Sequence, residues 1–486
     1  MTHAADILID GGYVLTMDAR NTVIDNGAVV IRGDRLVDIG PSEVIRDRYA
    51  CAKTIDANGK IVMPGLIDAH AHGGHGMIKT VGENLPTRTW FELADFIYFR
   101  STSEAFWAAE ARLSALERLK FGTTCCVSML GSAPRSDRAV FADAHMAAAL
   151  EVGGHNIVGI GPARPPWPKL YSEWEGSERR DYWSSLDDNY ATVESVIRRW
   201  HGRHNGLAGV CVAASRLAPA SNETNAETMS YFADQARRMR RLADEYGVCL
   251  TGHASAGVGG MTISGQDAMA LCDPLLYGPF LIVAHGLGLS AETIGKLRDA
   301  GASVAHCPSA RVHYNTRCPV IELLEEGVTV AIATDASASD RTFDLFKDVK
   351  VAMILQRTHF HDASVLPPGK ALKMITIDAA HALGLGDEIG SLESGKRADV
   401  ILIDLQQPHL YPPFMRPQRV AYEVTGHDVS TVIVAGRICM ENRKVLTINE
   451  TSVLDEVRRE AELMVERSGI APLLSTPDRF WDGARY

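Results

Sequence analysis

Residues 61–72, IVMPGLIDAHAH, lead an apolar run directly into two histidines, His70 and His72. A short aliphatic run bounded by turn residues predicts a buried β-strand. Side chains two positions apart in a strand point to the same face, so both imidazoles would project together from its end. The stretch therefore predicts a strand that delivers a pair of nitrogen ligands to one place.

Seven further apolar runs follow, and sequences with helical periodicity alternate with them. The runs occupy residues 123–130, 155–161, 206–214, 248–255, 279–286, 302–309 and 328–337. Clear helical spacing separates several of them, as in 103–122, 226–247 and 290–301. Strands that alternate with helices form parallel sheets, and eight such units predict an α/β fold, a (β/α)8 barrel over residues 63–385.

The segments on either side of the barrel have a different sequence pattern. Residues 1–62 and 386–450 are rich in short β-runs punctuated by Gly, Asn and Asp. We expect them to form one composite small β-domain, a β-sandwich built from the N- and C-terminal segments. Residues 451–486 are expected to form a C-terminal helix and tail.

Composition excludes several classes of protein. The chain has 486 residues, 46% of them hydrophobic, and a net charge of −11. This acidic balance argues against a nucleic-acid partner or an anionic membrane. No apolar run reaches the ~20 residues that span a bilayer. The start of the chain lacks a signal-peptide pattern, and the nine cysteines are scattered without a CxxC motif. We therefore expect a cytoplasmic protein with reduced thiols.

Polar residues end the later apolar runs as well. His253 ends the fifth expected strand, His285 the sixth, His306 the seventh and Asp335 the eighth. Barrel strands bring their C-terminal residues to one face, so these groups should converge there.

Three imidazoles and a carboxylate form a site for one divalent ion with a position left for water. We expect the ligands to be His70, His72, His253 and Asp335. Zn²⁺ is the expected ion, and Fe²⁺, Mn²⁺ and Co²⁺ also suit this ligand set. Such an ion lowers the pKa of its water towards ~7, and a carboxylate can accept the proton that is released.

These motifs together resemble the metal-dependent amidohydrolase superfamily over most of the chain. PGLIDAHAH resembles its first-strand signature, and further similar motifs are GHASAG, AHGLGLS, AHCPSAR, TDASASDRTFDLFKDVKVAMI and IGSLESGKRADVILIDL. The most similar branch holds triazine hydrolases and guanine-type deaminases. The resemblance implies the same four metal ligands, with Asp335 also shuttling protons. It further implies that His285 orients the attacking water and that His306 contacts the substrate.

Two departures from the family pattern narrow the expected chemistry. Many members hold two metals bridged by a carbamylated lysine, but this chain has no lysine between Lys169 and Lys296, so one metal is expected. Ring deaminases of this branch usually carry His-x-x-Glu on the fifth strand, and the glutamate protonates a ring nitrogen. Here the corresponding residue is Ala256, which cannot donate a proton.

The missing glutamate favours a hydrolase that cleaves a non-peptide C–N bond of amide, urea or carbamate type in a small molecule. The alternative is an aminohydrolase, deaminase or dehalogenase acting on a triazine, purine or pterin-like heterocycle. A non-catalytic binding protein is a third hypothesis, against which the intact ligand set argues. The resemblance also implies a homo-oligomer.

Four residues near the expected mouth are candidate substrate contacts: His75, Arg216, His306 and His313. His75 follows two glycines beyond the first strand, where it could contact substrate or only pack beneath a loop. Arg216 could bind a carboxylate or carbonyl, or could pair with an acid on the surface. Residues 162–183, rich in Pro, Trp and Tyr, are expected to form an irregular lid or binding wall over the barrel.

Overall fold

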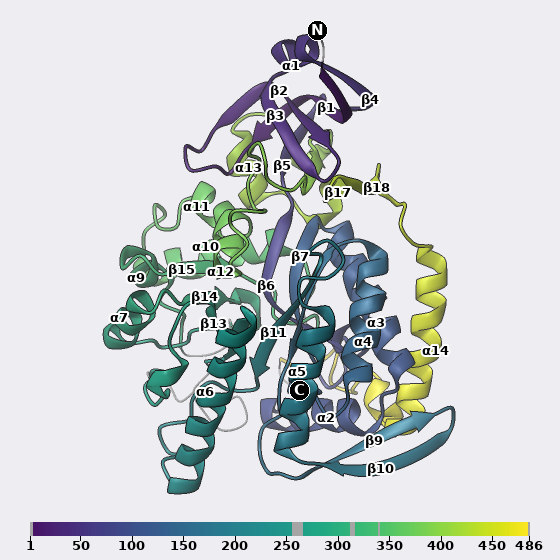
Figure 1. Ribbon diagram of the computed structural model, residues 1–486, viewed down its shortest axis with the longest axis vertical. Helices are drawn as coiled ribbons and strands as arrows, with labels where there is room; N and C mark the ends of the chain where they lie inside the picture. Colours follow the sequence, from purple (N-terminus) through teal and green to yellow (C-terminus); the bar gives the residue numbers. More distant parts are fainter. Residues whose placement is uncertain (1–2, 255–265, 312–315, 339–340, 485–486) are drawn as a thin grey trace.

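Eight parallel strands form a barrel, and each strand corresponds to one of the apolar runs identified in the sequence. The computed structural model describes residues 3–254, 266–311, 316–338 and 341–484 (Figure 1). The strands are hydrogen-bonded in the order β6-β7-β8-β11-β12-β13-β14-β15. Their bounds are β6 (Leu66–Gly73), β7 (Thr123–Leu130), β8 (His155–Ile160), β11 (Ala208–Ala214), β12 (Cys249–His253), β13 (Leu281–Ala284), β14 (Ser303–His306) and β15 (Thr329–Ile332). A parallel bridge between Ala71 and Asp335 brings the first and last strands together, which confirms the predicted (β/α)8 barrel.

Helices surround the barrel, and their ends follow ordinary capping chemistry. These helices include α3 (Glu104–Lys120), α4 (Ala139–Val152), α5 (Leu186–Trp200), α6 (Ala226–Tyr246), α7 (Ala291–Asp299), α8 (Pro308–Arg311), α9 (Val320–Glu325), α10 (Leu345–Phe360), α11 (Pro368–Lys373) and α12 (Ile377–Ala382). The Asn225 side chain accepts a hydrogen bond from the backbone of Thr228 at the start of α6, and Gly247 ends this helix with φ of 65°. No helix of the described residues is both long and apolar enough to cross a bilayer.

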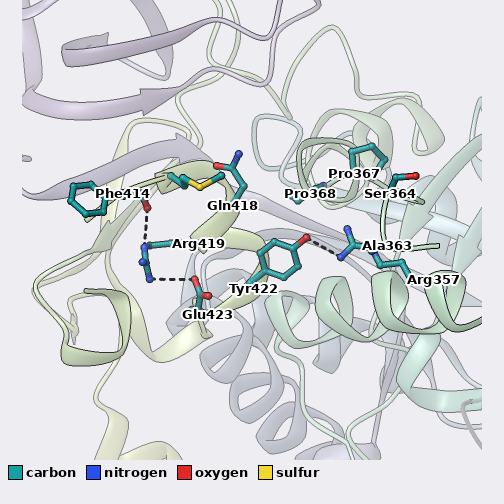
Figure 2. Close-up of a pocket in the computed structure, with 11 residues that line it drawn as sticks. Arg357, Ala363, Ser364, Pro367, Pro368, Phe414, Gln418, Arg419, Tyr422 and Glu423 are labelled. Carbon is teal, nitrogen blue, oxygen red and sulfur yellow. Dashed lines mark hydrogen bonds and ion pairs between the residues drawn. The ribbon is translucent and has the colours of Figure 1, made fainter. Parts of the chain in front are cut away.

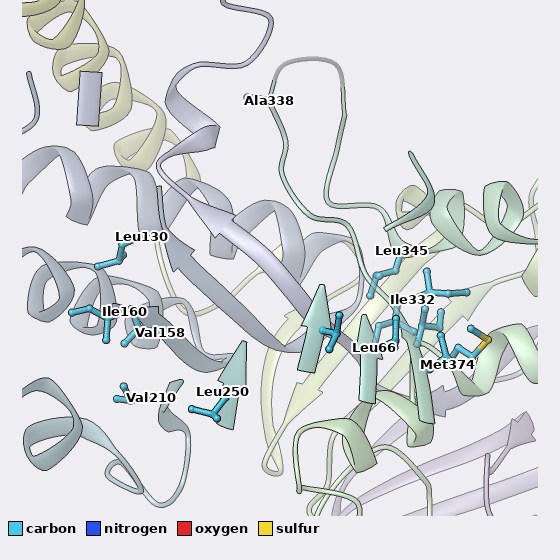
Figure 3. Close-up of a cluster of buried hydrophobic side chains, with 14 of the residues drawn as sticks. Leu66, Leu130, Val158, Ile160, Val210, Leu250, Ile332, Ala338, Leu345 and Met374 are labelled. Atoms are coloured by element: carbon cyan, nitrogen blue, oxygen red, sulfur yellow. The ribbon is translucent and has the colours of Figure 1, made fainter. Parts of the chain in front are cut away.

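The buried side chains separate into layers that follow the two-residue period of the strands. Leu66, Val158 and Ile332 belong to the large cluster between strands and helices (Figure 3). Ile67 and Val127 belong to a second cluster, which the alternation of strand side chains places inside the barrel. The pairing of β6 with β7 shifts register between Asp68 and Ala71. This irregularity lies beside the histidine pair, where it re-aims the end of β6.

A nine-stranded sheet joins the two ends of the chain and lies at the top of Figure 1. Its strands are β1 (His3–Leu15), β2 (Val23–Arg32), β3 (Arg35–Pro41), β4 (Tyr49–Asp56), β5 (Lys60–Pro64), β16 (Val400–Asp404), β17 (Val429–Val434), β18 (Arg437–Glu441) and β19 (Lys444–Val445). Strands β5 and β16 pair antiparallel and so connect the N- and C-terminal parts. An ion pair of 2.9 Å between Nε2 of His155 and Oδ2 of Asp399 ties this sheet to the barrel. Helix α1 (Ser42–Arg48) packs on β2 and β3 of this sheet. Helix α13 (Arg416–Tyr422) contacts α10 and α11, and α14 (Glu450–Ser468) lies beside α3 (Figure 1).

At the opposite end, α2 (Thr87–Arg100) lies beside a hairpin of β9 (Lys169–Glu175) and β10 (Glu178–Ser184) (Figure 1). The expected irregular segment is thus partly a regular antiparallel ribbon. Arg135, wholly buried, joins the two elements by donating to the carbonyls of Tyr98 and Ser172 and pairing with Asp137 at 3.0 Å. The C-terminal helix α14 braces the hairpin, because Arg467 donates to the carbonyl of Gly176 at 2.8 Å.

Candidate metal centre

His70, His72, His253 and Asp335 converge at the C-terminal ends of the barrel strands, and all four are buried. One donor atom from each lies within 4.8 Å of the others. Nε2 of His72 is 3.1 Å from Nε2 of His253. Oδ1 of Asp335 is 3.2 Å from Nε2 of His72 and 3.5 Å from Nε2 of His70. Among the described residues, this is the one cluster of His, Cys, Asp and Glu that could hold an ion.

Backbone carbonyls orient two of the imidazoles towards the centre of the cluster. Nδ1 of His72 lies 2.6 Å from the carbonyl oxygen of Gly131, and Nδ1 of His253 lies 2.8 Å from that of Ser215. A carbonyl can only accept, so each Nδ1 carries the proton and donates it. Each Nε2 is then left as a lone-pair donor to a metal ion, an arrangement typical of metal-binding histidines. The residues present therefore fit a divalent ion bound by three nitrogens and one oxygen.

The position of Asp335 depends on bonds between the first and last barrel strands. Its backbone N–H donates to the carbonyl of His70 at 3.0 Å, and its φ of 64° is unusual for a residue with a side chain. Asp68 reinforces the junction by accepting from the backbone N–H and hydroxyl of Thr334 at 3.2 and 2.5 Å. Strained backbone that is held in this way is common at functional sites.

The cluster keeps the Asp335 carboxylate ionised. Burial acts to raise its pKa, but the neighbouring His70, His72 and His285 together hold the pKa well below its usual range. An ionised carboxylate at this position suits both a metal ligand and a proton acceptor.

His285 and His306 complete the row of strand-end histidines. The His285 ring stacks on His253 with centroids 5.4 Å apart and lies 5.7 Å from the His70 ring. Its φ of 69° is a second left-handed conformation at this face. His306 is buried, and burial lowers the pKa of its imidazole to about 4. Its Nε2 has no hydrogen-bond partner among the described residues.

His75 lies against the metal cluster rather than away from it. Its ring centroid is 5.1 Å from that of His72, and burial, followed by the influence of His72, holds its pKa well below the usual range. Trp90 and Tyr98 of α2 pack on the same ring, at 5.6 and 5.8 Å. These aromatic neighbours were not predicted, because nothing in the sequence of α2 indicates which barrel residue it covers.

The remaining predicted contacts have different outcomes. Arg216 follows β11, and its guanidinium pairs with Glu223 at 2.5 Å and donates to the Ala218 carbonyl at 3.1 Å. The structure thus shows an acid partner for this arginine, while its predicted substrate contact stays a prediction. His313 and Ala256 lie outside the described residues.

Arg341 is a neighbour of the metal cluster that the sequence did not single out. Its Nη2 is 3.7 Å from Oδ2 of Asp335, and its Nε donates to the carbonyl of Ala336 at 3.2 Å. Oδ1 of Asp335 faces His70 and His72, so Arg341 approaches the other oxygen of the carboxylate. The one feature of the sequence that could have indicated this contact is that Arg341 follows Asp335 by six residues.

A solvent-facing pocket of about 610 Å³ lies elsewhere, between the end of α10, the start of α11 and helix α13 (Figure 2). Its charged groups are already engaged: Arg357 donates to the Tyr422 hydroxyl at 2.9 Å, and Arg419 lies 3.6 Å from Glu423. None of the metal-cluster residues lines it. The chemistry therefore belongs to the strand-end cluster.

Comparison with known proteins gives consistent matches. The model of the amidohydrolase family matches residues 61–439. The 5'-deoxyadenosine deaminase of Methanococcoides burtonii is 30% identical over 485 residues, covering 95% of this chain and 99% of the relative. The zinc-bound structure of an adenosine deaminase from Xanthomonas campestris superposes with a TM-score of 0.81 at 25% identity, covering 96% and 100% of the two chains. The atrazine chlorohydrolase of Arthrobacter aurescens TC1, in complex with zinc, shares the fold with a TM-score of 0.75 at 21% identity, covering 94% and 100%.

Proposed function

The chain belongs to the amidohydrolase family, and from this premise we propose that it is a zinc-dependent aminohydrolase of an amino-substituted nitrogen heterocycle. The coarser activity, metal-dependent hydrolysis of a carbon–nitrogen bond, follows from the family and the ligand cluster together. The proposed substrate class is an adenine-type nucleoside, whose exocyclic amino group leaves as ammonia. The names of similar proteins, a 5'-deoxyadenosine deaminase and an adenosine deaminase, support this class.

The observation that carries the proposal is the buried cluster of His70, His72, His253 and Asp335, with carbonyls fixing two of its imidazoles. A bound zinc ion lowers the pKa of a coordinated water towards neutrality and so supplies a nucleophile at neutral pH.

The chain's own residues would manage the protons of the reaction. The two carboxylate oxygens of Asp335 have different neighbours: Oδ1 lies 3.2 and 3.5 Å from Nε2 of His72 and His70, and Oδ2 lies 3.7 Å from Nη2 of Arg341. In our proposal this oxygen accepts the proton of the attacking water and returns it to the departing amino group. His285, beside His253 and His70, hydrogen-bonds the attacking oxygen and stabilises the charge that develops on it.

A second candidate function is hydrolysis of an amide or urea C–N bond. Ala256 favours it, because such a substrate has no ring nitrogen that must be protonated. The two candidates are separated by incubating zinc-loaded protein with panels of adenine nucleosides, pterins, aminotriazines, amides and ureas. Ammonia release confined to the heterocycles supports the proposal, and turnover of amides or ureas alone overturns it.

We further propose that the protein works in the cytoplasm as a homo-oligomer, without nucleic-acid or membrane partners. The acidic charge of −11 and nine free cysteines, eight of them buried, support this location. Light scattering of the purified protein tests the assembly, and a monomeric mass at all concentrations contradicts it.

A further inference from the structure

His75 occupies a short 3-10 turn, η1 (His75–Met77), immediately beyond β6. The glycine before it, Gly74, has φ of 87°, and a Cβ there would lie 2.7 Å from the Tyr98 ring. Glycine therefore lets the chain turn back and place the His75 ring between His72 and the aromatic residues of α2. The side chain is buried, with 3% of its surface exposed.

One nitrogen of this ring is satisfied by the protein and the other is not. Nε2 lies 3.2 Å from the hydroxyl of Ser132, which follows β7. Nδ1 is buried and has no hydrogen-bond partner among the described residues. A buried polar atom left unmatched costs about 1–3 kcal/mol, so such an atom beside a ligand-binding centre points to a partner that arrives with the ligand.

The surroundings of the ring fix its orientation. Trp90 and Tyr98 pack on it, and the indole N–H of Trp90 is anchored to the carbonyl of Val81 at 3.0 Å. When the Ser132 hydroxyl donates to Nε2, Nδ1 carries the ring proton and is a donor. The ring, whose centroid lies 5.1 Å from that of His72, then carries one N–H of fixed orientation that no protein group accepts among the described residues.

We propose that His75 is a specificity-determining residue whose Nδ1–H donates a hydrogen bond to a ring nitrogen of the heterocycle bound at the metal centre. This inference rests on the proposed function. It differs from the role of the family's strand-5 glutamate, because His75 approaches from the side of β6 and β7, whereas position 256 follows β12. The hydrogen bond selects substrates that carry an acceptor nitrogen on that side.

Two substitutions at position 75 separate the two ring nitrogens. The side-chain amide of His75→Asn can occupy the place of Nδ1, whereas that of His75→Gln reaches the place of Nε2. His75→Phe keeps a flat ring without polar atoms, and Ser132→Ala removes the partner of Nε2. Each protein is zinc-loaded, and zinc content and thermal stability are measured to confirm that the centre and the fold are retained.

The probes are adenosine and deaza analogues in which one ring nitrogen at a time is replaced by C–H. We measure the KM and kcat of adenosine, the inhibition constant of each analogue, and, by calorimetry, binding of the deaminated product inosine. For wild-type protein and His75→Asn, one analogue should bind about tenfold more weakly than the others, corresponding to one lost hydrogen bond. His75→Gln and His75→Phe should lose this discrimination and raise KM more than they lower kcat.

Identical ranking of the analogues by wild type, His75→Gln and His75→Phe overturns the inference. So does equal loss of discrimination in His75→Asn and His75→Gln when both retain zinc and stability. Failure of the proposed function looks different, because wild-type protein itself would then release no ammonia from any heterocycle.

Discussion

Replacing Asp335 by asparagine removes one charge from the metal centre while keeping the shape of the side chain. The backbone bond from Asp335 to His70, at 3.0 Å, and the packing of the barrel stay in place, so the fold should be retained. The change has two chemical effects. It weakens binding of the metal ion, because it replaces an anionic ligand whose Oδ1 lies 3.2 Å from Nε2 of His72. It also removes the proton acceptor at Oδ2.

General-base catalysis is worth about 10²–10⁴-fold, which corresponds to about 3–5 kcal/mol of activation free energy. We therefore expect Asp335→Asn at saturating zinc to lower kcat for ammonia release by at least about 10²-fold, with a melting temperature within a few degrees of wild type. Asp348→Asn is the matched control, since Asp348 is a buried aspartate of α10 outside the metal cluster, and its activity should be unchanged. If Asp335→Asn holds zinc and keeps more than a tenth of wild-type kcat, Asp335 is not the proton shuttle.

Three further predictions concern the residues around the centre. His285→Ala should lower kcat by about 10²–10³-fold without loss of bound zinc, as measured by steady-state kinetics and elemental analysis; unchanged kcat would exclude a role at the attacking oxygen. Asp137→Asn strips the buried Arg135 of its counter-ion, so the free energy of unfolding in urea should fall by about 3–5 kcal/mol, and a fall below 1 kcal/mol contradicts the reasoning. Burial raises the pKa of Asp348 from 3.8 to about 7. Between these pH values the unfolded state has lost the proton and the folded state still holds it, so Asp348 lowers the free energy of unfolding increasingly as the pH rises. Asp348→Asn keeps an acceptor for the Ser309 N–H and should stabilise the protein by on the order of 3 kcal/mol at pH 8 and by little at pH 4; equal effects at both pH values contradict this.

The barrel and its metal ligands could be predicted because their signals are local. A parallel strand buried on both faces needs a continuous apolar run, and a polar residue at its end marks the active face, as at His253 and Asp335. The spacing of His70 and His72 places both rings on one face. The barrel and the convergence of these four residues in one cluster were therefore predictable from residue type and position, and their role as metal ligands stays a prediction.

Features that depend on distant pairings could not be predicted in this way. The segment after β8 was expected to be irregular, but residues 169–184 form a hairpin held by Arg135 from after β7 and Arg467 from α14. The partner of Arg216 is Glu223, and a charged pair seven residues apart in a loop has no sequence signature. The approach of Arg341 to Asp335 likewise depends on how one loop folds back.

The sequence alone favoured amide substrates over heterocycles because of a single residue, Ala256. Ala256 removes a proton donor that ring deaminases usually have, and this made heterocycle deamination the alternative rather than the first hypothesis. Two of the similar proteins are named as deaminases of adenine-type nucleosides, which supports the alternative.

The most direct test of the account is a zinc titration of metal-free protein, with ammonia release from 5'-deoxyadenosine or adenosine as the readout. The account predicts no release without metal, a linear rise on adding zinc, and saturation at one equivalent per chain. Ammonia release from the metal-free protein, or saturation only at two equivalents, would contradict a single zinc bound by His70, His72, His253 and Asp335. Full zinc binding without ammonia release from any heterocycle would contradict the proposed reaction.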